Sequence, residues 1–188
     1  MPVRKLSHEE ILKTKPSVLE VQKKKKNNIY ALLDNIRSLY NVGAIFRTSD
    51  AVQLKKLFLC GITGTPPRPE IEKTALGATQ VVDFEYEKNP ITVIQKLKKK
   101  GVKIVAIELC KESKDFRKMK IEGETCFVFG HEVFGVNDEI LKYCDESYHI
   151  PMGGRANSLN VATCFGVIMF EVLKKLKKGK SGKLLFCL

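Results

Sequence analysis

Short apolar runs alternate with helical segments from residue 28 onwards, and this alternation constrains the fold more than any other feature. Spacing of apolar side chains predicts helices over 42–52 and 137–143, and a long final helix from 158 to about 178. Pro90 suits the first turn of another helix that runs to Leu97. Because strands that alternate with helices build a mostly parallel sheet covered on both faces, we predict an α/β fold. The six runs expected to be strands are 29–33, 56–62, 81–86, 102–109, 125–129 and 146–150.

Prolines interrupt this pattern after the second run. Pro66, Pro67 and Pro69 lie within four positions, and each lacks the backbone N–H that regular structure uses. The segment 63–69 is therefore predicted to be an irregular loop.

The size of the chain suits a single domain. Its 188 residues, 44% of them hydrophobic, can bury one substantial core. No stretch approaches the roughly 20 apolar residues that cross a bilayer, and the first ten residues lack the apolar centre of a secretory signal. We expect a cytoplasmic protein without a membrane partner. The six cysteines form no C-x-x-C pair, so reduced thiols and no metal site are expected.

Positive charge is concentrated at the two ends of the chain. Residues 1–26 hold eight basic side chains against three acidic ones, and residues 174–188 hold six lysines and no acid. The part between them is nearly neutral, although the whole chain carries +12. Lysine-rich ends suit a polyanion such as RNA, and they equally suit solvated ends that aid solubility. We divide the chain into a basic extension over 1–27, a core domain over 28–178 and a basic tail over 179–188.

Several familiar functional motifs are absent from the sequence. No G-x-G-x-x-G follows the first strand, which argues against a Rossmann-type dinucleotide or methyltransferase loop. No G-x-x-x-x-G-K-[ST], H-E-x-x-H or G-x-S-x-G is present either, so an NTPase, a zinc peptidase and a serine hydrolase are disfavoured.

Three separated segments carry polar groups at places where a strand gives way to a helix. The first, 35–47, puts Asn41 at a helix start, where it could be the N-cap, and Arg47 two turns further on. Arg47 could be an ordinary surface arginine paired with Asp50, or a planar cation that grips phosphate.

The second segment, 130–136, follows a strand directly. Gly130 and Gly135 allow a tight turn or close approach to a ligand, and Glu132 places an acid between them. A plain strand-to-helix turn is the alternative. The third segment starts with Ile150, Pro151 and Met152 and leads to the run 158–161. Ser158 could cap the final helix, whereas a buried amide at Asn160 needs partners that a ligand could supply.

These three segments, in this order, resemble motifs 1, 2 and 3 of the SpoU/TrmH family of RNA ribose methyltransferases. The first motif is read as Asn41 to Ala51, the second as Gly130-x-Glu132-x-x-Gly135, and the third as Ile150-Pro151-Met152 with Ser158-Leu159-Asn160. The stretch 73–78 also resembles a segment that recurs between motifs 1 and 2. The resemblance covers residues 28–174, nearly the whole core.

The resemblance implies an α/β-knot (SPOUT) fold with a C-terminal trefoil knot, a homodimer, and S-adenosylmethionine as cofactor. It places the cofactor in bent form in the loops of the knot, with contacts made largely through backbone groups. The residues implied to bind the cofactor are Gly130, Ile150, Leu159, Leu109 and Met152. The residues implied to form the active site are Arg47, Ser158, Asn160, Asn41 and Glu132.

The implied reaction is in-line transfer of a methyl group to a ribose 2′-hydroxyl of tRNA or rRNA. Arg47 would assist the hydroxyl, either as a perturbed base or, with less demand on a guanidinium, by holding phosphate or stabilising an alkoxide. Ser158 and Asn160 would orient Arg47 or the ribose, while Asn41 and Glu132 would hold the loops. Methylation of a base and a non-catalytic RNA-binding protein of the same fold are the alternatives.

Overall fold

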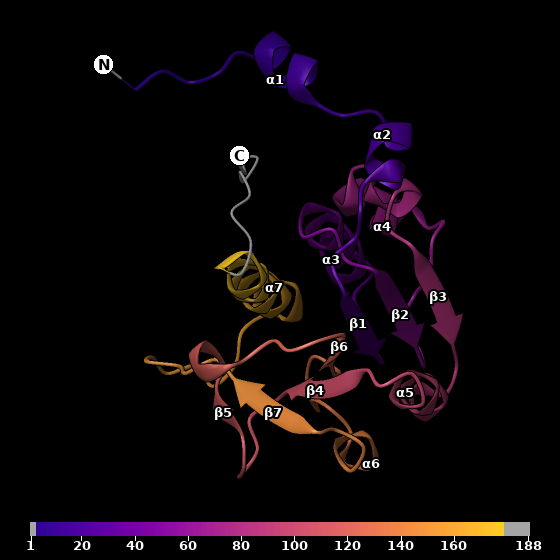
Figure 1. The fold of residues 1–188 in the computed structure, drawn as a ribbon, viewed down its shortest axis with the longest axis vertical. Helices are drawn as coiled ribbons and strands as arrows, with labels where there is room; N and C mark the ends of the chain where they lie inside the picture. Colours follow the sequence, from indigo (N-terminus) through magenta and orange to yellow (C-terminus); the bar gives the residue numbers. More distant parts are fainter. Residues whose placement is uncertain (1–2, 179–188) are drawn as a thin grey trace.

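A seven-stranded parallel sheet forms the centre of the computed structural model, which describes residues 3–178 (Figure 1). The strands lie in the order β3-β2-β1-β6-β4-β7-β5, and every registered pair is parallel. The predicted α/β fold and its six longer strands are confirmed. The two-residue strand β5 was not predicted, because so short an element carries no periodic pattern. The strands are β1 Ile29–Asp34, β2 Lys56–Cys60, β3 Phe84–Glu87, β4 Lys103–Ile107, β5 Lys114–Asp115, β6 Thr125–Phe129 and β7 Glu146–His149.

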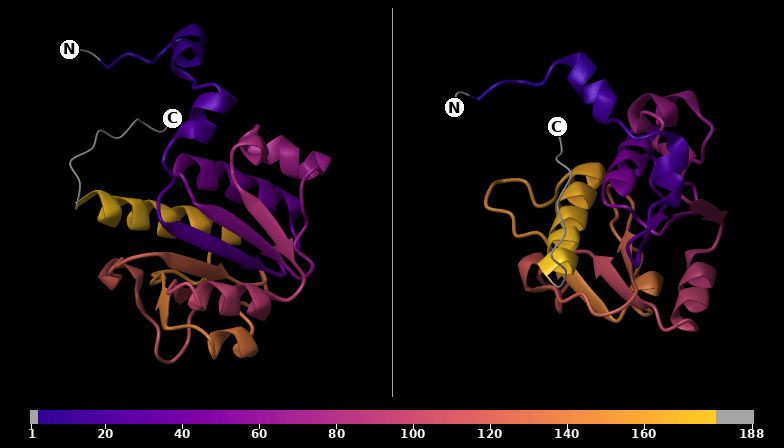
Figure 2. Two further views of the ribbon diagram at one scale, coloured as in Figure 1. Left: turned by 45° about the vertical axis from the view of Figure 1, so that its right-hand side comes forward. Right: turned by 45° about the horizontal axis from the view of Figure 1, so that its top comes forward.

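Helices cover both faces of the sheet (Figure 2). Alternate side chains of a strand point to opposite faces, so Ile29, Ala31 and Leu33 pack in the core beneath α3, α4 and α7. Tyr30 and Leu32 belong to the second core, beneath α5 and α6. The helices are α1 His8–Thr14, α2 Val18–Lys23, α3 Leu39–Ala51, α4 Pro69–Ala75, α5 Pro90–Lys98, α6 Asp138–Leu141 and α7 Val161–Lys178, with 3-10 turns η1 Ala78–Gln80 and η2 Phe116–Lys118.

The caps of two helices differ from the prediction. Ser38, not Asn41, caps α3, because the Ser38 hydroxyl accepts the Asn41 N–H at 3.3 Å. Asn160, not Ser158, caps α7, since its Oδ1 accepts the N–H groups of Ala162 and Thr163 at 2.9 and 3.3 Å. Both helices thus begin at different residues from those predicted.

The proline-rich segment is also more regular than predicted. Pro69 is the first residue of α4. At that position the missing N–H costs nothing and the ring's fixed φ favours the helix. The prediction of irregular structure therefore holds only up to Arg68.

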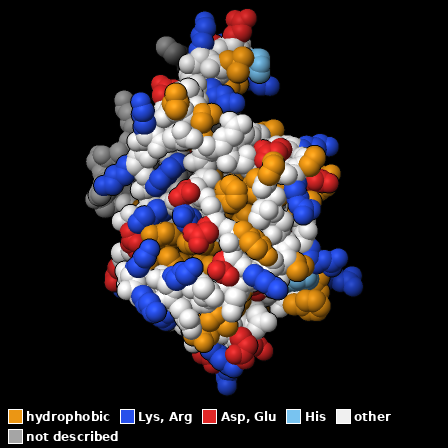
Figure 3. All heavy atoms as spheres, turned by 90° about the vertical axis from the view of Figure 1, so that its right-hand side faces the viewer, with side chains coloured by type: hydrophobic (Ala, Val, Ile, Leu, Met, Phe, Trp, Pro, Cys, Tyr) orange, Lys and Arg blue, Asp and Glu red, His pale blue; other side chains and the backbone are white. Residues whose placement is uncertain are grey.

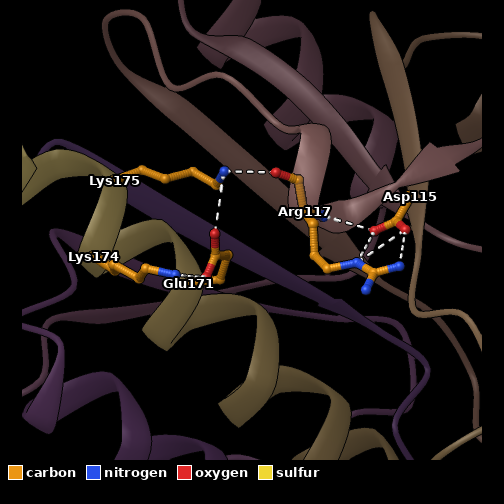
Figure 4. A network of polar contacts seen from close by, with 5 residues as sticks. All are labelled: Asp115, Arg117, Glu171, Lys174 and Lys175. Carbon is orange, nitrogen blue, oxygen red and sulfur yellow. Dashed lines mark hydrogen bonds and ion pairs between the residues drawn. The ribbon is translucent and has the colours of Figure 1, made fainter.

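The long loop between β4 and β6 is tied to the end of α7 (Figure 4). Lys175 Nζ donates to the backbone oxygen of Arg117 at 2.8 Å and pairs with Glu171 at 3.1 Å. Arg117 in turn pairs with Asp115 on β5. These contacts connect the last helix to a segment that precedes it by some 50 residues.

The basic extension contains two short capped helices. Val21 of α2 is buried, and Gln22 Nε2 donates to the backbone oxygen of Gln80 at 3.0 Å, so α2 rests on the body. No residue of α1 is buried, and α1 stands clear of the body (Figures 1 and 3). The basic tail predicted at 179–188 lies outside the described residues. None of the helices described in 3–178 is both long and apolar enough to span a membrane.

The thiols described by the structure are all unpaired, as predicted: Cys60, Cys110, Cys126, Cys144 and Cys164. Burial raises the pKa of Cys60 to about 12, which keeps that thiol neutral. Within residues 3–178 no cluster of three or more potential metal ligands occurs. Cys187 lies outside the described part of the chain.

Phe165 joins α7 to the centre of the sheet, and its removal should destabilise the fold. It is fully buried, and its ring centroid lies 4.9 Å from that of Phe129 on β6. Phe165→Ala should lower the free energy of unfolding by about 3–5 kcal/mol, measured by urea denaturation. Ile62→Ala, at an exposed loop position, is the control and should stay within about 0.5 kcal/mol of wild type. Equal losses in the two variants would contradict this account of α7.

Candidate active site

A cavity of about 460 Å³ opens at the carboxyl ends of β4, β6 and β7. Three loops line it: residues 108–109 after β4, 130–135 after β6, and the stretch from Ile150 to Asn160 after β7. These strands are neighbours in the sheet, so loops far apart in sequence meet at one edge. Ligands of open parallel sheets bind at this edge, and the cavity volume falls in the usual range for small-molecule sites.

The structure brings all five residues predicted to contact a cofactor into this one cavity. Gly130 lines it from the second segment, and Leu109 from the end of the fourth predicted strand. Ile150, Met152 and Leu159 line it from the third segment. The loops therefore converge, as a shared ligand would require.

Glu132 fastens the second segment to the first. Its carboxylate accepts the backbone N–H groups of Arg37 and Ser38, both at 3.0 Å, and the side-chain amide of Asn41 at 3.3 Å. Burial alone raises the pKa of Glu132, but these donors outweigh burial and the pKa is lowered. The ionised carboxylate thus satisfies N–H groups at the start of α3, where a negative charge is favourable.

Asn41 continues this network to the third segment. The Asn160 amide donates to Asn41 Oδ1 at 3.1 Å, while Asn160 Oδ1 caps α7. Glu132, Asn41 and Asn160 therefore form one chain of hydrogen bonds across all three segments. Asn41 does not itself line the cavity. Its side chain instead supports the second and third segments by holding Glu132 and Asn160. Ser158 does line the cavity, and its exposed hydroxyl takes no part in this network.

Two glycines let the second segment turn tightly against Glu108. Gly135 has φ +68°, and a Cβ there would lie 2.1 Å from Glu108 Oε2. A Cβ on Gly130 would meet the backbone of Gly135 at 2.1 Å. Glu108 accepts the N–H groups of Val136 and Leu109, each at 2.8 Å. Only glycine fits at these two positions.

The charges at the cavity favour a cationic ligand. Two carboxylates, Glu108 and Glu132, line it, together with the imidazoles of His131 and His149. No lysine or arginine lies among the lining residues in the described part of the chain. Burial raises the pKa of Cys164, which also lines the cavity, to about 11, so this thiol is neutral at pH 7 and unsuited to nucleophilic attack.

Arg47 is not placed at the cavity of its own chain. It lies exposed on α3 and does not line the cavity, and its guanidinium makes no hydrogen bond or ion pair with a residue in 3–178. The alternative pairing with Asp50 is therefore wrong. Burial raises the pKa of Asp50, which no arginine stabilises.

Several residues at the cavity were not predicted. Glu108 follows a buried strand run and could have been found as an acid at a strand's carboxyl end. His149 ends β7 in the same way, and its Nδ1 lies 2.8 Å from the Ser113 hydroxyl. Other lining residues that escaped the sequence reasoning are His131, Val133, Phe134, Asn157 and Cys164.

A second hollow of about 250 Å³ lies beside α5. Two of its lysines are paired locally, Lys55 with Glu124 and Lys56 with Glu85. Basic and acidic side chains are interspersed over the face of the molecule drawn in Figure 3. None of the predicted site residues lies in this hollow.

Comparisons with known proteins show which sequences and structures this chain is similar to. The model of the SpoU rRNA Methylase family matches residues 28–170. The tRNA (guanosine(18)-2′-O)-methyltransferase of Aquifex aeolicus is 34% identical over 156 residues, which cover 83% of this chain and 74% of that enzyme. A crystal structure of the A. aeolicus TrmH/SpoU tRNA modifying enzyme superposes with a TM-score of 0.79 at 33% identity, covering 91% of this chain and 85% of the other. An AdoMet-bound rRNA methyltransferase from Sinorhizobium meliloti has a TM-score of 0.75 at 26% identity, covering 86% of this chain and 61% of the other.

The Glu132 network predicts a pH-dependent loss of stability on mutation. Glu132→Gln should lower the free energy of unfolding at pH 7 by about 1–3 kcal/mol, because N–H donors lose a charged acceptor. A lowered carboxyl pKa gives stability that is present above the ordinary pKa and is lost as pH falls through the folded-state pKa. The difference between variant and wild type should therefore shrink in urea titrations near pH 3. Glu139→Gln, at an exposed helix position, is the control, and a gap that persists at low pH would refute the role of the charge.

Proposed function

The chain belongs to the SpoU rRNA methylase family, and from this premise we propose that it transfers a methyl group from S-adenosylmethionine to a ribose 2′-hydroxyl of tRNA or rRNA. The observation that carries the proposal is the single cavity that the loops of motifs 2 and 3 line together with residues 108–109. Asn41 of motif 1 is hydrogen-bonded to both of those loops, through Glu132 and Asn160. The relative from A. aeolicus is named for a guanosine of tRNA, which makes tRNA the first substrate to test.

The cavity suits this cofactor on physical grounds. S-adenosylmethionine supplies an electrophilic methyl group on a sulfonium cation. Glu108 and Glu132 give the cavity negative charge, and no basic side chain among the lining residues opposes it. Backbone groups of Gly130, Ile150 and Leu159 would hold the cofactor, with apolar contact from Leu109 and Met152.

The acceptor side of the site involves Ser158 and Asn160. The Ser158 hydroxyl lines the cavity and is free to orient a ribose hydroxyl. Asn160 lines it too, but its amide is held by Asn41 and the start of α7. We therefore assign Ser158 to the substrate, and Asn160, Asn41 and Glu132 to the positioning of the loops.

For Arg47 to take part in the reaction, a second copy of the chain has to bring it to a cavity. Tyr40 and Arg47 share the outward side of α3, seven residues apart. On the adjoining helix α7, Val167 and Phe170 are large exposed apolar side chains. We propose that this surface pairs with itself in a two-fold homodimer. Arg47 would then reach the cavity of the partner, where a guanidinium can hold phosphate or stabilise the developing alkoxide.

The remaining features inferred from the resemblance stay proposals of the same kind. We assign methyl transfer to a domain over 28–178 and RNA attraction to the basic extension and tail. The trefoil knot and the cytoplasmic location also stay predictions. Methylation of a base remains the second enzymatic candidate, because the cofactor cavity alone does not determine which atom of the RNA receives the methyl group.

Incubation with labelled S-adenosylmethionine tests the activity directly. Label should enter tRNA or rRNA, and nucleoside mass spectrometry should find it on a ribose. Label on a base would select the second candidate. Calorimetric failure to bind S-adenosylmethionine would instead favour a non-catalytic RNA-binding protein.

Arg47→Ala should lower turnover at least about 100-fold, the scale of lost transition-state electrostatics, while the Kd for S-adenosylmethionine stays unchanged. Arg68→Ala, at another exposed arginine, is the matched control. Activity of Arg47→Ala equal to wild type would remove Arg47 from the mechanism.

Mixed dimers test whether Arg47 acts across subunits. We expect Arg47→Ala and Ser158→Ala each to be inactive alone. When equal amounts exchange subunits, half of the dimers are mixed, and one of their two sites keeps both residues. Activity should recover to about one quarter of wild type in a two-fold dimer. No recovery, with subunit exchange verified by mass, would show that both residues act in one subunit.

A further inference from the structure

A large aromatic side chain stands exposed at the mouth of the cavity. Phe134 is 83% exposed and its neighbour Val133 is 73% exposed, although both line the cavity wall. Exposed apolar residues that stand singly need no explanation, but a contiguous pair on the rim of a ligand site indicates contact with a partner.

Four hydrogen bonds close the turn that carries Phe134. His131 and Gly135 exchange two backbone hydrogen bonds of 3.0 and 2.8 Å across it. The His131 Nδ1 atom accepts the N–H groups of Val133 and Phe134 at 3.0 and 3.4 Å.

His131 also supports the aromatic ring itself. The centroids of the His131 and Phe134 rings lie 4.8 Å apart, and their planes are tilted by 34°. One side of Phe134 is therefore backed by an imidazole, and most of the ring remains available to a partner. An aromatic ring held in place before binding loses little conformational entropy when it stacks.

The free charges beside this turn are positive. Glu132, the acid within the turn, directs its carboxylate to the backbone at the start of α3. The side chain of Arg37, whose own N–H binds Glu132, is exposed and forms no ion pair within residues 3–178. Arg155, in the third segment, is likewise exposed. An aromatic ring with a neighbouring cation and no free acid in the turn suits a nucleotide: the base stacks and the phosphate pairs.

We propose that the Phe134–His131 pair is a stacking platform for a nucleobase of the RNA substrate, and that Arg37 contacts a phosphate beside it. The proposal rests on the proposed function, because it takes the bound RNA to present a ribose at the adjoining cavity. Unpaired bases of RNA are recognised by stacking of this kind. The platform holds the acceptor nucleotide, or its immediate neighbour, next to the methyl donor.

Substitution of Phe134 tests the platform. Phe134→Leu should reduce kcat/KM for RNA by about 5- to 150-fold, the range expected when one stacked base loses its aromatic partner. The Kd for S-adenosylmethionine, measured by calorimetry without RNA, should stay unchanged. Phe134→Tyr should restore most of the loss, because it returns a π-face of the same size. Ile62→Ala, at an exposed apolar position that does not line the cavity, is the control and should leave both values unchanged.

Arg37→Gln tests the phosphate contact separately. It should weaken RNA binding and reduce the slope of log Kd against log salt by about one. An unchanged slope would remove Arg37 from the proposal.

Three results would overturn the role of Phe134. RNA kinetics of Phe134→Leu equal to wild type would show that the ring does not stack on RNA. A weaker Kd for S-adenosylmethionine would assign the ring to the adenine of the cofactor. Dissociation of a dimer, followed by light scattering, would assign it to a second copy of the chain. Methylation by wild type is measured first, so an inactive wild type would count against the proposed function and not against the platform.

Discussion

The carboxylate of Glu132 is the interaction on which the geometry of the site depends. Four backbone N–H groups at the start of a helix have no partner within that helix. Glu132 reaches from the loop after β6 to the N–H groups of Arg37 and Ser38, so the start of α3 and the turn at residues 130–135 have one fixed separation. The Asn41 amide extends the same contact to Asn160 and the start of α7. A shorter acid would not span this gap, and an uncharged side chain would leave donors without a strong acceptor.

Parallel strand order makes such a contact possible. β6 lies between β1 and β4, and β7 lies beyond β4, so segments some 20 residues or more apart in sequence end at one edge. The loop after β4 would be free to move on its own, but β5 and the contact between Lys175 and Arg117 fix it against β7 and α7. The cavity is therefore enclosed by loops that are each attached to a neighbour.

Sequence reasoning succeeded where the signal is local and failed where the partner is distant. Four of the six longer strands, β1, β2, β4 and β6, are buried almost throughout and were recognised because such strands are continuous apolar runs. The caps of α3 and α7 were assigned to the wrong residues, because each stretch before the helix holds several side chains able to cap. Glu108 and His149 were missed, since their partners are backbone or hydroxyl groups that sequence spacing does not reveal. The second and third segments were predicted at the carboxyl ends of strands, and they lie there beside one cavity, whereas the exposure of Arg47 on α3 depends on packing that the sequence does not show.

The distribution of charge resolves a conflict within the proposed reaction. A sulfonium donor is cationic and an RNA backbone is anionic, so no single sign of charge attracts both. The chain separates the two: its acids at the cavity, Glu108 and Glu132, are held by backbone N–H groups, and no basic side chain of the described residues joins them. Its arginines near the site, Arg37, Arg47 and Arg155, are exposed outside that cavity. Exposed charges attract a polyanion over about 10 Å, the Debye length at 0.1 M salt. A cation inside the cavity lies closest to the two carboxylates, and their attraction falls off with distance and is screened less by salt than that of exposed groups. A chain of net charge +12 can therefore attract RNA and still present a negative pocket to a cation.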